Sequence, residues 1–130
     1  MEALGLLPGI DVSTWFDGGI GGVELYRRLL GMFLAAQQSF PAPFAAALAS
    51  ADLNTARRLA HDLKAIAGTL GAHGVERVSA ALEEACAREE PAHRLQHLLD
   101  DLASHLHPVL DGLRASFALS QAGTDSVVHP

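Results

Sequence analysis

Apolar residues recur at intervals of three and four along most of this chain. Residues at that spacing share one face of an α-helix, whereas a half-buried strand would alternate apolar and polar side chains. The helical spacing occurs in four stretches: residues 23–40, 52–72, 74–89 and about 92–119. The sequence contains no strand-like alternation of comparable length. The pattern therefore predicts an all-α protein.

Four amphipathic helices in one chain can bury their apolar faces against each other. Only 5% of the residues are aromatic, so alanine and leucine, both strong helix formers, supply most of the core. Gly71 and Gly74 indicate a tight turn that makes the second and third stretches antiparallel neighbours. We therefore expect an antiparallel up-down-up-down four-helix bundle over residues 1–120, with short additional helices near residues 12–16 and 44–50. Pro108 is expected to kink or split the last helix, and residues 121–130 to form a disordered tail.

Charge and composition exclude several classes of partner. The formal net charge of −6 argues against nucleic acid, because phosphate backbones require a basic surface. The single cysteine, Cys86, excludes an internal disulfide and is expected to be an inert buried thiol. The first ten residues lack a basic start and are broken by glycine and proline, so they do not resemble a signal peptide. No apolar run reaches the roughly 20 residues that span a bilayer, and we expect a cytoplasmic domain without direct membrane contact.

The second helical stretch carries the segment AHDLKAIAGTLGA, residues 60–72. Each residue of an α-helix advances by roughly 100°, so the apolar stripe of Leu59, Leu63, Ile66 and Leu70 points away from His61. This phase predicts an exposed imidazole. On the side of the helix to which His61 points, the sequence places the cation Lys64 and three small residues, Ala65, Gly68 and Ala72. A second cation, Arg57, lies one turn earlier on the same side.

An exposed imidazole in such surroundings suits nucleophilic chemistry. Free imidazole has a pKa of about 6.5, so much of it is uncharged at neutral pH. Lys64, one turn along, is placed to meet the negative charge of a phosphoryl group on the ring. Gly68 costs a helix up to about 1 kcal/mol relative to alanine, which favours a steric reason for it, such as room for a partner's active site. The alternative is that His61 is an ordinary surface histidine, one of seven in the chain.

The same segment resembles the active-site segment of histidine-containing phosphotransfer (HPt) domains, which read His-x-Leu-Lys-Gly with a following Leu-Gly-Ala. The matching residues are His61, Leu63, Lys64, Leu70, Gly71 and Ala72. Residues 7–33 resemble the start of HPt domains fused to hybrid sensor kinases, and residues 80–89 resemble their third long helix. One departure is Ala65, which stands where the family has glycine. Its methyl group is expected to narrow the range of partners without blocking phosphorylation.

The resemblance implies a role for each of these residues. His61 would be phosphorylated on Nε2, with Lys64 as the charge partner of the phosphoryl group. Response-regulator receiver domains, which bring a phospho-aspartate and Mg²⁺, would dock over Arg57, Ala65, Gly68 and Ala72. The chain itself would bind no cofactor or metal and would act as a monomeric carrier rather than an independent enzyme. Its setting would be the cytoplasm, including the cytoplasmic end of a membrane-bound hybrid kinase.

Two other functions remain compatible with the residues. The first is a non-covalent helical adaptor, in which the face around His61 is only a docking surface. The second is the dimerisation helix of a histidine kinase, although its phosphoacceptor motif has a proline five residues after the histidine, where this chain has Ile66. His93 and His97 share an exposed helical face, but no carboxylate completes a metal site there, so solvated surface histidines are expected.

Overall fold

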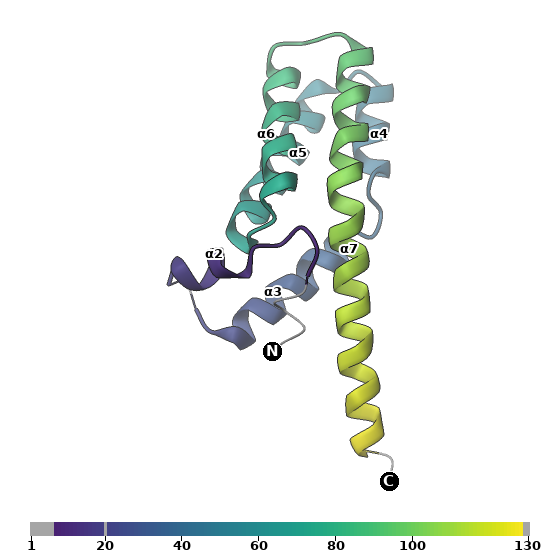
Figure 1. The fold of residues 1–130 in the computed structure, drawn as a ribbon. Helices are drawn as coiled ribbons and strands as arrows, with labels where there is room; N and C mark the ends of the chain where they lie inside the picture. Colours follow the sequence, from purple (N-terminus) through teal and green to yellow (C-terminus); the bar gives the residue numbers. More distant parts are fainter. Residues whose placement is uncertain (1–6, 20, 129–130) are drawn as a thin grey trace.

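The computed structural model describes residues 7–19 and 21–128, and all its regular elements within them are α-helices (Figure 1). The all-α prediction is therefore confirmed. The helices are α2 (Val12–Asp17), α3 (Val23–Ala36), α4 (Ala42–Ala49), α5 (Leu53–Leu70), α6 (His73–Ala87) and α7 (Ala92–Val128).

The helices form a bundle around α5, α6 and α7. Helix α5 packs against α6, which packs against α7, and α4 covers α5 and α7 from the other side (Figure 1). Helix α3 runs across the base of the bundle and contacts both α5 and α7. The chain reverses between α5 and α6 and again between α6 and α7, so these three neighbours alternate in direction, as predicted for the bundle.

Two residues set the ends of α5. The carboxylate of Asp52 caps the first turn by accepting hydrogen bonds from the backbone N–H and the hydroxyl of Thr55, at 3.2 and 2.7 Å. Gly71 ends the helix with φ of 91°, in the left-handed region where glycine is favoured. Helix α6 begins two residues later, which produces the tight antiparallel reversal.

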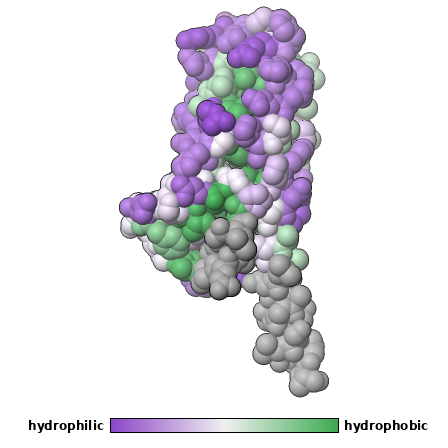
Figure 2. Space-filling view, viewed as in Figure 1, coloured by the Kyte–Doolittle hydropathy of each residue, from purple (hydrophilic) through white to green (hydrophobic). Residues whose placement is uncertain are grey.

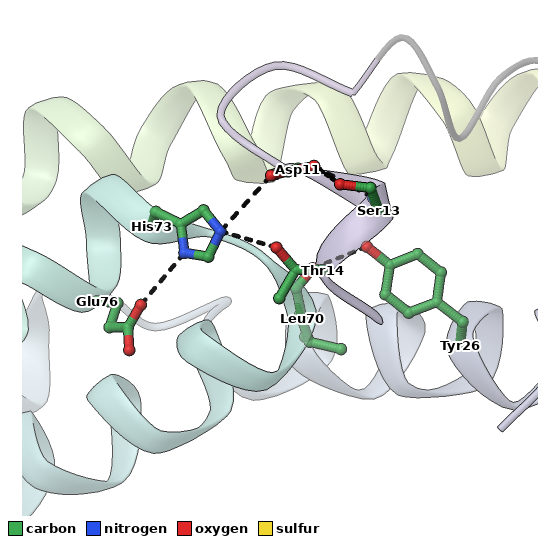
Figure 3. Close-up of polar contacts among 7 residues, drawn as sticks. All are labelled: Asp11, Ser13, Thr14, Tyr26, Leu70, His73 and Glu76. Carbon is green, nitrogen blue, oxygen red and sulfur yellow. Dashed lines mark hydrogen bonds and ion pairs between the residues drawn. The ribbon is translucent and has the colours of Figure 1, made fainter. Parts of the chain in front are cut away.

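An N-terminal segment, residues 7–19, packs over this reversal. The backbone N–H of Asp11 donates to the carbonyl of Gly71 at 2.8 Å, and the hydroxyl of Tyr26 donates to the carbonyl of Leu70 at 2.7 Å (Figure 3). Trp15 is fully buried and stacks on Tyr26 with ring centroids 5.1 Å apart. The end of α5 is thus held by hydrogen bonds from two separate parts of the chain.

Two predicted helix limits are wrong. The helix predicted over residues 23–40 ends at Ala36, and residues 37–41 form turns. Pro41 disfavours helical geometry at Phe40, so the helix does not reach its predicted limit. The last helix is not split at Pro108 and continues past the predicted limit to Val128. Pro108 lies on the exposed side of α7, while Val109, Leu110 and other apolar residues bury its inner side. The boundary expected at residue 120 therefore falls within α7, and residues 129–130 of the predicted tail lie outside the described residues.

The core consists mainly of leucine, valine and alanine from all the long helices. Figure 2 shows a mostly hydrophilic surface over the upper bundle and more hydrophobic residues near α2 at the base. One polar side chain lies inside the core: Ser79 of α6 is completely buried, and its hydroxyl has no hydrogen-bond partner among the described residues. A buried hydroxyl without a partner opposes folding.

We predict that Ser79→Ala stabilises the protein. The change removes the unpaired hydroxyl and adds helix propensity, for a gain of about 1 kcal/mol, or roughly 3–5 °C in the thermal midpoint of a chain of this size. Thermal denaturation followed by circular dichroism would measure it. Ser104→Ala on the exposed side of α7 is the control and should change the midpoint little. A lower midpoint for Ser79→Ala would show that its hydroxyl is satisfied in the folded protein.

Candidate functional site

His61 lies in the middle of α5, on the flank that faces α6. Its side chain is 57% exposed, which agrees with the predicted exposure. The buried stripe of α5 consists of Ala56, Ala60, Leu63, Ala67 and Leu70. Leu59 and Ile66, predicted to belong to the core stripe, are only half-buried. His61 therefore lies beside the buried stripe rather than directly opposite to it, within reach of side chains from α6.

A carboxylate from α6 connects His61 with Lys64. Nδ1 of His61 lies 2.8 Å from Oε2 of Glu83, and Nζ of Lys64 lies 2.7 Å from Oε1 of the same residue. The Glu83 side chain is 20% exposed. Its hydrogen bond with Lys64, followed by a smaller one with His61, lowers the pKa of the Glu83 carboxyl below its usual value of 4.5, although partial burial acts in the opposite direction.

This contact determines which nitrogen of the ring can act as a nucleophile. An ionised carboxylate only accepts hydrogen bonds, so the proton of the neutral imidazole lies on Nδ1. The lone pair is then on Nε2, at the edge of the ring away from Glu83. The arrangement presents an oriented, half-exposed nitrogen nucleophile with an anion behind it and a cation beside it.

Two arginines lie on the N-terminal side of His61. Arg57 and Arg58, both exposed, line a hollow of about 450 Å³ together with Asn54, His61 and Glu83. Hydrogen bonds from Thr55, with a smaller attraction from Arg58, lower the pKa of the Asp52 carboxyl nearby. The predicted position of Arg57 beside His61 agrees with this hollow.

The small residues predicted around His61 do not form one open surface. Ala65 is exposed, but Gly68 is half-buried, and a Cβ placed on it would come within 2.6 Å of Oε2 of Glu76. Ala72 is 1% exposed and lies in the core. The prediction that Ala72 shares the face of His61 is therefore wrong, because Gly71 ends the helix before that residue is reached.

A second polar cluster surrounds His73, at the start of α6 (Figure 3). Its Nε2 lies 2.8 Å from the hydroxyl of Thr14 and 3.8 Å from a carboxylate oxygen of Asp11. Its Nδ1 lies 3.3 Å from Oε1 of Glu76. The cluster connects the N-terminal segment to the carboxylate that lies over Gly68.

The sequence analysis missed Glu83, Glu76 and Arg58. His61 and Glu83 are 22 residues apart with Ala72 midway between them, and Gly68 and Glu76 are likewise centred on Ala72. Once Ala72, directly after Gly71, is taken as the centre of the reversal, residues at equal distances from it on two antiparallel helices lie opposite each other. Counting outward from the turn would therefore have paired His61 with Glu83.

Other candidate sites are not supported by the structure. Cys86 is buried, and burial raises the pKa of its thiol, as expected for an inert cysteine. Within residues 7–19 and 21–128, no group of three or more histidine, cysteine or acidic side chains is arranged to hold a metal ion. None of the helices described has the length and hydrophobicity that a membrane span requires.

Comparison with known proteins identifies a protein family. The family model described as Hpt domain matches residues 28–116, which include α4, α5 and α6 completely. Neither the curated proteins nor the solved structures contain a match to this chain. The matched range contains His61, Lys64 and Glu83, whereas the N-terminal segment with Asp11 and Thr14 lies outside it.

We predict that Glu83 makes part of the stability dependent on pH. Because its pKa is lower in the folded state, its contacts stabilise the fold fully above about pH 4.5 and are lost as the pH falls through the lowered value. Glu83→Gln removes this contribution, so the stability gap between wild type and variant should narrow below pH 4.5. Urea denaturation at a series of pH values would measure the gap. Glu84→Gln, on the solvent side of α6, is the control, and a gap of constant size from pH 6 to pH 3 would contradict the prediction.

Proposed function

Since the chain belongs to the Hpt domain family, we propose that it carries phosphoryl groups on His61 between receiver domains of a phosphorelay. Members of this family are phosphocarriers rather than enzymes with turnover of their own. The observation that carries the assignment to His61 is its contact with Glu83, because it leaves the lone pair on Nε2 of a half-exposed ring. His73, by contrast, lies between the two carboxylates of Asp11 and Glu76, which would repel an incoming phosphoryl group.

Transfer would proceed by direct displacement at phosphorus. The Nε2 lone pair of His61 forms the new N–P bond, and the bond from phosphorus to the receiver's aspartate breaks, with its electrons returning to that carboxylate. The ring keeps its proton on Nδ1 and becomes cationic. Glu83, 2.8 Å from that nitrogen, offsets the new positive charge. The reverse sequence passes the phosphoryl group to a second receiver, and the receiver supplies Mg²⁺ in each direction.

Lys64 would balance the negative charge in the site. Its ammonium is bound to Glu83 at 2.7 Å, so it reduces the repulsion between that carboxylate and an approaching phosphoryl group. Its side chain is one-third exposed, which allows the ammonium to shift toward phosphoryl oxygens once the N–P bond forms. Lys64 thus acts on the charge of the transition state, with no part in the bonds that change.

The wider setting follows from the same proposal. A receiver would approach over the flank of α5 and α6 that carries His61, including Arg57, Ala65 and Gly68. The domain would be a monomer in the cytoplasm, and residues 7–33 resemble the start of HPt domains that are fused to hybrid sensor kinases. Glu76 over Gly68 and the methyl group of Ala65 would both limit which receivers can approach closely.

We expect His61→Gln to abolish phosphoryl acceptance. The substitution removes the nucleophile at a half-exposed position, so helicity and thermal midpoint should change little. The measurement is incubation with a receiver phosphorylated by acetyl phosphate, followed by detection of acid-labile phosphate on the bundle. His93→Gln, at an exposed position on α7, is the matched control and should retain full acceptance. Phosphate on the His61→Gln protein would assign the chemistry to another residue. Absence of phosphate on the wild type would contradict phosphoryl transfer and favour the non-covalent adaptor function.

We expect Lys64→Ala to slow transfer without preventing it. Loss of one charge-assisted contact to the phosphoryl group should reduce the single-turnover rate by about 10- to 100-fold, or roughly 1.4–2.8 kcal/mol. Lys64→Arg should restore part of the rate because it keeps the charge. Rapid-quench measurements with the same receiver would give both values. Equal rates for Lys64→Ala and wild type would exclude an electrostatic role for this residue.

A further inference from the structure

The flank that carries His61 has charges of opposite sign at its two ends. Arg57 and Arg58 lie toward the start of α5, and the carboxylate of Glu76 lies over Gly68, toward its end. Between these ends, His61, Lys64 and Glu83 form a compact group with internally paired charges. The flank is therefore positively charged at one end and negatively charged at the other, although the net charge of the chain is negative.

The positive end has charge available for a partner. Arg57 and Arg58 are exposed and line the hollow that also contains the His61 ring. Within the described part of the chain, neither guanidinium forms an ion pair with a carboxylate. Among the described residues, Glu83 is the only carboxylate that lines this hollow, and its two oxygens are already bound to His61 and Lys64. Arg58 attracts the Asp52 carboxylate from a distance, but no carboxylate of the described residues forms an ion pair with Arg57 or Arg58, so both guanidinium groups can pair with acidic groups of a partner.

The negative end is held in place. Oε1 of Glu76 contacts His73, which contacts Thr14 and Asp11 of the N-terminal segment (Figure 3). The other oxygen, Oε2, lies where a side chain at position 68 would begin. The Glu76 side chain is nevertheless 43% exposed. A carboxylate held this way offers a fixed acceptor to a partner, because less side-chain freedom is lost on binding.

Both ends fall within the area that one docked protein covers. Gly68 is seven residues from His61, or about 10 Å along the helix, and Arg57 is about 6 Å away in the other direction. An interface of standard size covers about 800 Å² on each partner, which corresponds to a radius of about 16 Å. A receiver centred on His61 would therefore contact Arg57, Arg58 and Glu76 together.

We propose that this polarity orients and selects the receiver, an inference that rests on the proposed function. The fitting receiver places acidic groups against Arg57 and Arg58, at one side of its phospho-aspartate, and places a basic side chain against Glu76. A receiver turned half-way around on the same nucleophile would bring like charges together at both ends. Like-charge contacts of this kind disfavour the wrong orientation and the wrong partner.

Charge reversal at each end tests the polarity. The donor is an isolated receiver domain that transfers to the wild-type chain, phosphorylated with acetyl phosphate. Arg57→Glu with Arg58→Glu, and separately Glu76→Lys, should each lower the second-order rate constant for single-turnover transfer by about tenfold or more at low salt. Both losses should appear mainly as a higher half-saturating receiver concentration and shrink in 1 M salt, where the Debye length is about 3 Å. Arg77→Glu combined with Arg114→Glu matches the net-charge change of the arginine pair, and Glu84→Lys matches that of Glu76→Lys. All three control positions are exposed on α6 or α7 away from the hollow, and these variants should have little effect.

The Glu76→Lys variant distinguishes docking by charges of both signs from docking by positive charge alone, because the two predict opposite changes in the transfer rate. If receivers were attracted only by positive charge, this variant would be faster than wild type, which would overturn the polarity. Equal rates for wild type and both end variants would overturn it as well. If the wild-type chain accepts no phosphoryl group from any receiver, the proposed function fails and the inference fails with it. If the wild-type chain accepts the phosphoryl group and the rate is the same in both end variants, the proposed function stands and only the inference on polarity fails.

Discussion

The geometry of the site depends on the chain reversal at Gly71. With φ of 91°, this residue has the conformation that glycine adopts at low cost, and a Cβ there would overlap the backbone of Asp11. The close approach allows the Asp11 N–H to bind the Gly71 carbonyl at 2.8 Å. A reversal in so few residues leaves one register for α5 against α6, and that register brings Glu83 to His61. A reversal one residue longer would turn the carboxylate of Glu83 away from the ring.

This dependence explains what the sequence could and could not predict. Helical phase and turn residues are local, so the exposure of His61 and the tight reversal near Gly71 followed from the sequence. The partner of His61 comes from another helix, and its identity depends on the register of packing. The burial of Ala72 was missed for a related reason. Its exposure was predicted from the periodicity of α5, but Ala72 lies one residue beyond Gly71, where the helix has already ended. The uninterrupted α7 reflects packing on its inner side, which outweighs the local effect of Pro108.

The N-terminal segment has a structural role that the family match does not include. The match begins at residue 28, yet Trp15 is fully buried and Thr14 contacts His73 at 2.8 Å. Through His73 the segment positions Glu76, about 10 Å along the bundle from the nucleophile. A part of the chain outside the matched domain thus shapes the surface on which we propose that a receiver docks. The matched range supplies His61, and this additional segment fixes the position of a charge at the edge of that surface.

The charges next to His61 suit a carrier that must both accept and release its cargo. In the proposed transfer, Glu83 would stabilise the cationic ring that forms with the N–P bond, but its negative charge would repel the phosphoryl oxygens. Lys64, which is bound to the same carboxylate at 2.7 Å, would attract those oxygens. The two effects would oppose each other, so neither the free nor the phosphorylated histidine would be strongly favoured. Each 1.4 kcal/mol of bias would change the transfer equilibrium tenfold, and a relay intermediate that strongly retained the group would block the following step. A single carboxylate shared by the nucleophile and its charge partner keeps that bias small.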